Sequence, residues 1–158
     1  MSPKIDFEQL DLRGAFDLAI MIEEDAQLRY EELVQQFPDE PGGAVAVFRQ
    51  MAVNEAKHRA DLEARRRVLF KTSPPRIEIS VLDAPGVEEP GPGWDTGPTM
   101  TAREALEMAL AAEVNAFEFY AGAIPHVKDA GVRAFFQELM EEELEHQALL
   151  KKKLAELR

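Results

Sequence analysis

Four stretches of this chain repeat apolar residues at steps of three and four positions. They cover residues 12–37, 45–70, 101–124 and 131–157, approximately. Residues at these steps fall on one face of an α-helix, whereas a half-buried strand alternates apolar and polar positions. Because an amphipathic helix must bury its apolar face against another element, the pattern predicts an all-α protein in which four helices form a bundle.

Signals at the ends of these stretches predict how the helices are connected. Pro38 closes the first helix, and the turn 39–43 before the second is short, so these two helices should be antiparallel neighbours. Thr101 followed by Glu104 is a capping-box pattern that begins the third helix, and Pro125 ends or kinks it. The third and fourth helices should therefore form a second hairpin.

The segment 71–100 differs in composition from the rest of the chain. It carries six of the ten prolines and four of the nine glycines, which excludes a continuous helix. An extended segment of this length spans about 100 Å, whereas a helix of the predicted length measures about 38 Å. We therefore expect a single domain, 1–158, in which this crossover joins two antiparallel hairpins and lets the second and third helices run parallel.

Composition limits the partners and ligands of the protein. Eighteen basic against thirty acidic residues give a net charge of −12, which repels nucleic acid and anionic lipid. No run of roughly 18 apolar residues and no apolar signal core is present, so we expect a cytoplasmic protein without a membrane partner. The chain has no cysteine, so any metal must be bound through oxygen and nitrogen.

Each predicted helix carries a glutamate in the middle of its apolar face. In the second helix Glu55 and His58, and in the fourth Glu143 and His146, form Glu-x-x-His motifs. Residues three apart on a helix lie on one side, about 5–6 Å apart at Cβ, so a carboxylate and an imidazole can bind one ion. The first and third helices each add a lone glutamate. The candidate metal ligands are Glu23, Glu55, His58, Glu113, Glu143 and His146.

The two halves of the chain repeat this pattern. Glu23 is followed seven residues later by Tyr30, and Glu113 seven residues later by Tyr120. A Glu-x-x-His motif follows on the next helix in both halves. The repeat predicts a pseudo-twofold site with one histidine for each of two metal ions and two glutamates that can bridge them.

The charge of the predicted site indicates what it binds. Four glutamates in an apolar core are very costly unless protons or cations neutralise them, and two divalent ions balance four carboxylates. Ligands rich in oxygen with some histidine suit iron or manganese well and zinc acceptably. We therefore predict two iron ions per chain, with manganese or zinc as alternatives.

Taken together, these motifs and the long crossover resemble the ferritin-like di-iron carboxylate proteins, especially rubrerythrins and bacterioferritins. The resemblance extends over all four helical stretches and implies a ferritin-like four-helix bundle. It implies bridging roles for Glu55 and Glu143 and terminal roles for Glu23 and Glu113. It also implies an oxidoreductase that reacts Fe(II) with dioxygen or hydrogen peroxide, as a ferroxidase or peroxidase.

The resemblance assigns Tyr30 and Tyr120 as hydrogen-bond donors behind the metal ligands, although both could simply be core aromatic residues. Rubrerythrins typically add a carboxylate on the third helix, where this chain has Ala109 and Ala116 near Glu113, and a cysteine-rich rubredoxin domain. The departures imply an external electron donor. No haem is predicted, and a homo-oligomer, a dimer or larger, is expected.

Two alternative functions stay open on the sequence alone, as does the role of one pair of polar residues. The same centre could serve an iron-storage or sequestration subunit, or it could be structural metal in a non-catalytic helical interaction domain. Asn54 and Glu142, each directly before a motif glutamate, either orient the imidazole of the opposite helix or face solvent.

Overall fold

The computed structural model describes residues 6–71 and 100–157. Its long helices are α1 (Leu12–Gln36), α2 (Val45–Phe70), α3 (Ala102–Ala123) and α4 (Ala130–Glu156), and the short 3-10 helix η3 (Ile124–His126) lies between α3 and α4. The described residues contain no strand. The predicted all-α four-helix bundle is confirmed.

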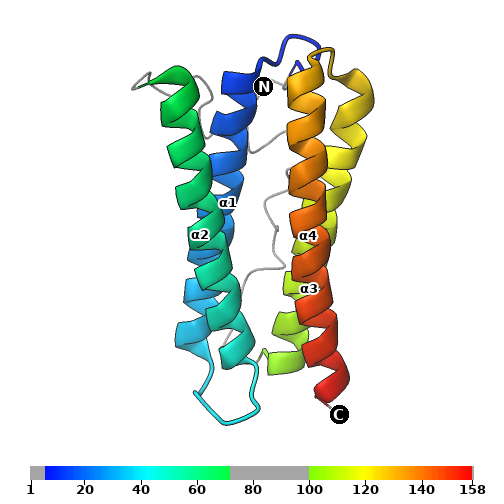
Figure 1. Ribbon diagram of the computed structural model, residues 1–158. Coiled ribbons are helices and arrows are strands. Elements are labelled where there is room, and N and C mark those ends of the chain that lie inside the picture. Colours follow the sequence, from blue (N-terminus) through cyan, green and yellow to red (C-terminus); the bar gives the residue numbers. More distant parts are fainter. Residues whose placement is uncertain (1–5, 72–99, 158) are drawn as a thin grey trace, which may run out of the picture.

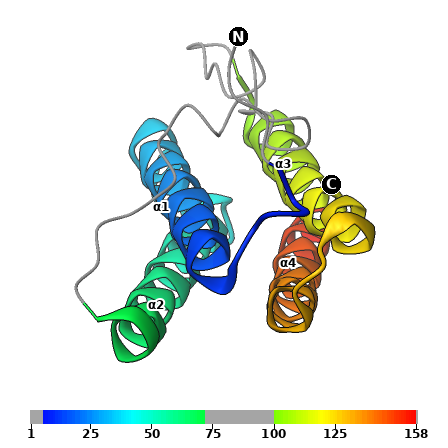
Figure 2. The same cartoon turned by 90° about the horizontal axis from the view of Figure 1, so that it is seen from above.

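The helices form two antiparallel hairpins, α1 with α2 and α3 with α4, which stand side by side (Figures 1 and 2). Helices α2 and α3 run in the same direction, as predicted (Figure 1). The predicted crossover 71–100 lies outside the described residues except for its two end positions. No helix in the part of the chain that the structure describes is long and apolar enough to cross a membrane.

The predicted signals end the helices within a residue or two of the expected positions. Thr101 and Glu104 form the capping box, with the Glu104 amide donating to the Thr101 hydroxyl at 3.1 Å. Asp11 caps α1 by accepting a hydrogen bond from the Gly14 amide at 2.8 Å. Helix α1 stops before Phe37, whose backbone is extended because Pro38 disfavours helical geometry in the residue before it.

The apolar core consists of two clusters at opposite ends of the bundle. One cluster, which includes Phe16, Phe119 and Phe136, joins the start of α1 to the end of α3 and the start of α4. The other, which includes Leu33 and Leu106, joins the end of α1 to the start of α3. The middle of the bundle, between the clusters, is therefore the part of the interior where polar side chains gather.

Two arginines of α2 bind acidic residues of the neighbouring helices. Arg66 donates from Nε to Asp17 of α1 at 2.5 Å, and both side chains are buried. Arg65 pairs with Glu138 of α4 at 2.7 Å, where both side chains are largely exposed. These contacts fix the end of α2 against α1 and α4.

Candidate metal centre

The four glutamates predicted as ligands lie inside the bundle, one on each helix. Glu23, Glu55, Glu113 and Glu143 are between 1 and 4% exposed. Each sits near the middle of its helix, because the three- and four-residue spacing that turns apolar residues inward also turns these positions inward. Four carboxylates at this depth require neutralisation by protons or cations.

His146 lies among three of these carboxylates. Its Nδ1 atom is 3.1 Å from Glu55, 3.4 Å from Glu113 and 3.8 Å from Glu143. One ligand atom each from Glu55, Glu113 and His146 lies within 4.8 Å of the other two, and all three residues are buried. This inner group draws on α2, α3 and α4 and has the composition of a cation site.

A second group lies beside the inner one. Ligand atoms of Glu23, His58 and Glu142 also lie within 4.8 Å of one another. The His58 and His146 rings are 5.2 Å apart between centroids and nearly parallel, at 19°. Each group thus contains one histidine, as the sequence repeat predicted. In this outer group, which draws on α1, α2 and α4, His58 and Glu142 are each 26% exposed at the side chain.

The sequence reasoning did not identify Glu142 as part of a cation group. The sequence predicted only that Glu142 either orients an imidazole or faces solvent. Residue type alone does not distinguish Glu142 from Glu141 and Glu145, which stand close to it on the same helix. Asn54, given the same candidate role, accepts a hydrogen bond from Gln50 at 2.8 Å.

Several polar atoms of the two groups and of the neighbouring Glu143 are buried without a hydrogen-bond partner among the described residues. They include both carboxylate oxygens of Glu23, Oε2 of Glu143 and Nε2 of His146. Buried polar groups are normally hydrogen-bonded, and a buried carboxylate without a donor is costly. Divalent cations would satisfy these oxygens, so the donor set fits the metal ions that the sequence predicts.

The pKa values in the centre are strongly perturbed. Burial, followed by the charge of Glu55, raises the pKa of Glu23, and burial with the charge of Glu113 raises the pKa of Glu143. Burial also acts to raise the pKa of Glu113, but hydrogen bonding to Glu143, His146 and Tyr30 outweighs it and lowers that pKa. The pKa values of Glu113 and Glu143 are therefore shifted in opposite directions.

The two histidines respond in opposite directions. Burial acts to lower the pKa of His146, but hydrogen bonding to the surrounding carboxylates, Glu113 first, raises it far above its usual value. Burial, assisted by the charge of His146, lowers the pKa of His58. A lowered pKa favours the neutral imidazole, which is the form that binds a metal ion.

The two predicted tyrosines differ in their contacts. The Tyr30 hydroxyl donates to Oε1 of Glu113 at 2.5 Å, so it stands behind a candidate ligand as the resemblance implied. The Tyr120 hydroxyl is equally buried but has no hydrogen-bond partner in the described part of the chain. The pseudo-twofold relation thus places both rings in the core but pairs only one hydroxyl with a carboxylate.

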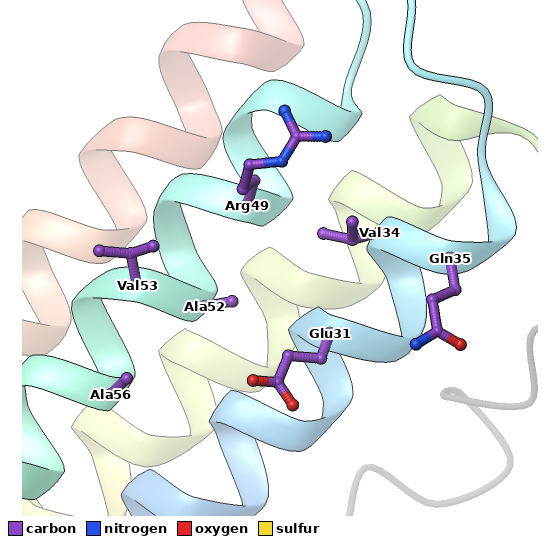
Figure 3. A pocket seen from close by; sticks show the side chains of 7 residues that line it. All are labelled: Glu31, Val34, Gln35, Arg49, Ala52, Val53 and Ala56. Atoms are coloured by element: carbon purple, nitrogen blue, oxygen red, sulfur yellow. The ribbon is translucent and has the colours of Figure 1, made fainter.

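A surface groove of about 370 Å³ lies on the outer side of the α1–α2 hairpin (Figure 3). Val34 of α1 and Ala52 of α2 lie where the two helices meet, and Glu31 and Arg49 stand at its edges (Figure 3). No residue that lines it belongs to either cation group. The groove is therefore separate from the candidate metal centre.

Fold and site together define a four-helix bundle whose core holds two adjacent groups of carboxylate and histidine side chains that could hold metal ions. The family model for rubrerythrin matches residues 15–154, which include all of the candidate ligands. The chain belongs to the rubrerythrin family. Searches of curated proteins and of solved structures gave no match.

Proposed function

We propose that this protein binds two iron ions in the core of its bundle and acts as an oxidoreductase that reacts Fe(II) with dioxygen or hydrogen peroxide. The observation that carries the proposal is the pair of adjacent groups, each with one histidine and at least two carboxylates, in a chain of the rubrerythrin family.

In this proposal the inner ion is bound by Glu55, Glu113 and His146, and the outer ion by Glu23 and His58. Glu143, whose Oε2 is buried without a partner among the described residues, lies 3.8 Å from His146 and would be a further ligand in the centre. Iron bound in this way would supply the electrons that reduce the oxidant. Manganese or zinc could occupy the same ligands.

The protein side chains contribute proton control and exclusion of water. Glu23 and Glu143 hold protons more tightly than ordinary carboxyl groups, so binding of cations displaces those protons. The Tyr30 hydroxyl holds Glu113 in a fixed orientation. The burial of four carboxylates keeps bulk water from the reacting centre.

Repeated turnover requires an outside source of electrons to return the oxidised iron to Fe(II), because the chain has no cysteine with which to hold an iron–sulfur electron donor. We therefore propose an external reductant as partner. We also propose that the protein acts in the cytoplasm as a homo-oligomer.

Anaerobic titration with Fe(II) tests the proposal. Binding should saturate near two ions per chain, and exposure to dioxygen or peroxide should then produce near-ultraviolet absorption and consume the oxidant. The double variant Glu55→Ala with His146→Ala should bind no iron at the inner position. Glu141→Gln is the matched control, because Glu141 is exposed on the same helix. Saturation at zero, or two bound ions that never oxidise, would overturn the proposal.

A further inference from the structure

The side chain of Glu142 faces the candidate metal centre although it lies outside the Glu-x-x-His motif. Its Oε2 atom lies 3.6 Å from Nδ1 of His58. Both atoms are buried and have no hydrogen-bond partner among the described residues. The contact is too long for a hydrogen bond, so another explanation for the approach of these two buried atoms is required.

The nitrogen that Glu142 approaches distinguishes between two roles. A residue that orients a metal-bound histidine accepts a hydrogen bond from the ring nitrogen that does not bind the metal. In the inner group, Nδ1 of His146 is the atom that faces the carboxylates. In the outer group, Nδ1 of His58 is likewise the atom that faces a carboxylate, and that carboxylate is Glu142. Glu142 therefore stands on the metal side of the ring.

The distance agrees with a cation between the two atoms. Bonds of about 2.0–2.2 Å from an ion to nitrogen and oxygen place two neighbouring ligand atoms roughly 3.0–3.6 Å apart. The third member of the outer group, Glu23, is 1% exposed and has no partner for either oxygen in the described residues. A buried, unpaired carboxylate thus points into the same group, which independently indicates a cation there.

We propose that Glu142 is a direct ligand of the outer ion, together with Glu23 and His58. The inference rests on the proposed binuclear centre and adds a seventh protein ligand to it. Helix α4 then supplies two consecutive ligands to the centre, Glu142 and Glu143. Because Glu142 and His58 are the partly exposed members of the centre, the outer ion is the one that exchanges with solvent.

Co(II) titration of the Glu142→Gln variant tests this role. Glutamine keeps an oxygen that can accept a hydrogen bond from an imidazole, but it has no charge and is a poor ligand. Wild-type protein should bind two Co(II) ions, with visible absorption bands from each. In the variant, one ion should bind as in wild type, and the other should bind more weakly by over about 100-fold, beyond the roughly 10- to 100-fold typical of a lost outer partner. The bands of the weakened ion should also change.

Controls separate this proposal from the proposed function. Glu141→Gln, on the exposed side of the same helix, should leave both affinities and both spectra unchanged. Circular dichroism of the metal-free variants should show equal helix content. If wild type binds two ions and Glu142→Gln weakens neither by more than about 100-fold and leaves both spectra unaltered, Glu142 is only a positioning residue and the inference is wrong, while the binuclear centre stands. If wild type binds no ion, both proposals fail.

Discussion

Tyr30 and Tyr120 hold equivalent places in the sequence repeat, yet their removal should have unequal effects. Tyr30→Phe deletes the donor of a 2.5 Å hydrogen bond to the buried carboxylate of Glu113. Hydrogen bonds to charged groups contribute about 1.5–3 kcal/mol. For a chain of this size, that loss lowers the melting temperature of metal-free protein by roughly 3–12 °C. Tyr120→Phe deletes a buried hydroxyl without a partner in the described residues, so its stability should match or exceed that of wild type.

Urea unfolding of chelator-treated protein, followed by circular dichroism, measures both changes. Each substitution removes a hydroxyl but keeps the aromatic ring. Ring packing, such as the 5.2 Å between the ring centroids of Tyr120 and Phe136, is therefore the same before and after the substitution. Near-ultraviolet dichroism should confirm that the remaining aromatic residues stay ordered. Losses above about 1 kcal/mol for both variants would refute the reasoning, because they would mean that Tyr120 also donates to a buried acceptor.

Two further predictions concern stability. Metal-free protein should become less stable as the pH rises above about 5, because burial and neighbouring charge raise the pKa values of Glu23 and Glu143, and the folded state then keeps protons that the unfolded chain releases; urea midpoints that rise with pH above this value would contradict it. Arg66→Met should destabilise the fold by up to roughly 3–5 kcal/mol, because it removes a buried ion-pair partner of Asp17. Arg65→Met, which breaks a largely exposed pair, should cost only about 1 kcal/mol; equal losses for the two arginine variants would show that burial does not set the difference.

The fold could be predicted from the sequence because its signals are local. Apolar spacing located four helices, and Thr101 and Pro38 located two of their ends, since capping and proline geometry depend on only a few neighbouring residues. The buried pair of Asp17 and Arg66 could not be predicted. It joins positions far apart in the chain, and a charged residue on a helix is ordinarily at the surface.

The sequence predicted that the four glutamates of the candidate site are buried. It did not predict which side chains of the site contact one another. Helical periodicity correctly turned the four glutamates inward, whereas their function as ligands stays a prediction. Periodicity cannot give the rotation of one helix against its neighbour, and that rotation brings Glu142 rather than Asn54 toward an imidazole. The same rotation brings the Tyr30 hydroxyl to the carboxylate of Glu113, whereas the Tyr120 hydroxyl has no hydrogen-bond partner among the described residues.

Both cation groups take their members from both hairpins. The outer group joins Glu23 and His58 to Glu142, and the inner group joins Glu55 to Glu113 and His146. Ions bound there would cross-link the two hairpins in the middle of the bundle, between the two apolar clusters. Parting the hairpins would then break coordination at both positions at once, so the free energy of ion binding would add directly to the resistance of the bundle against splitting lengthwise.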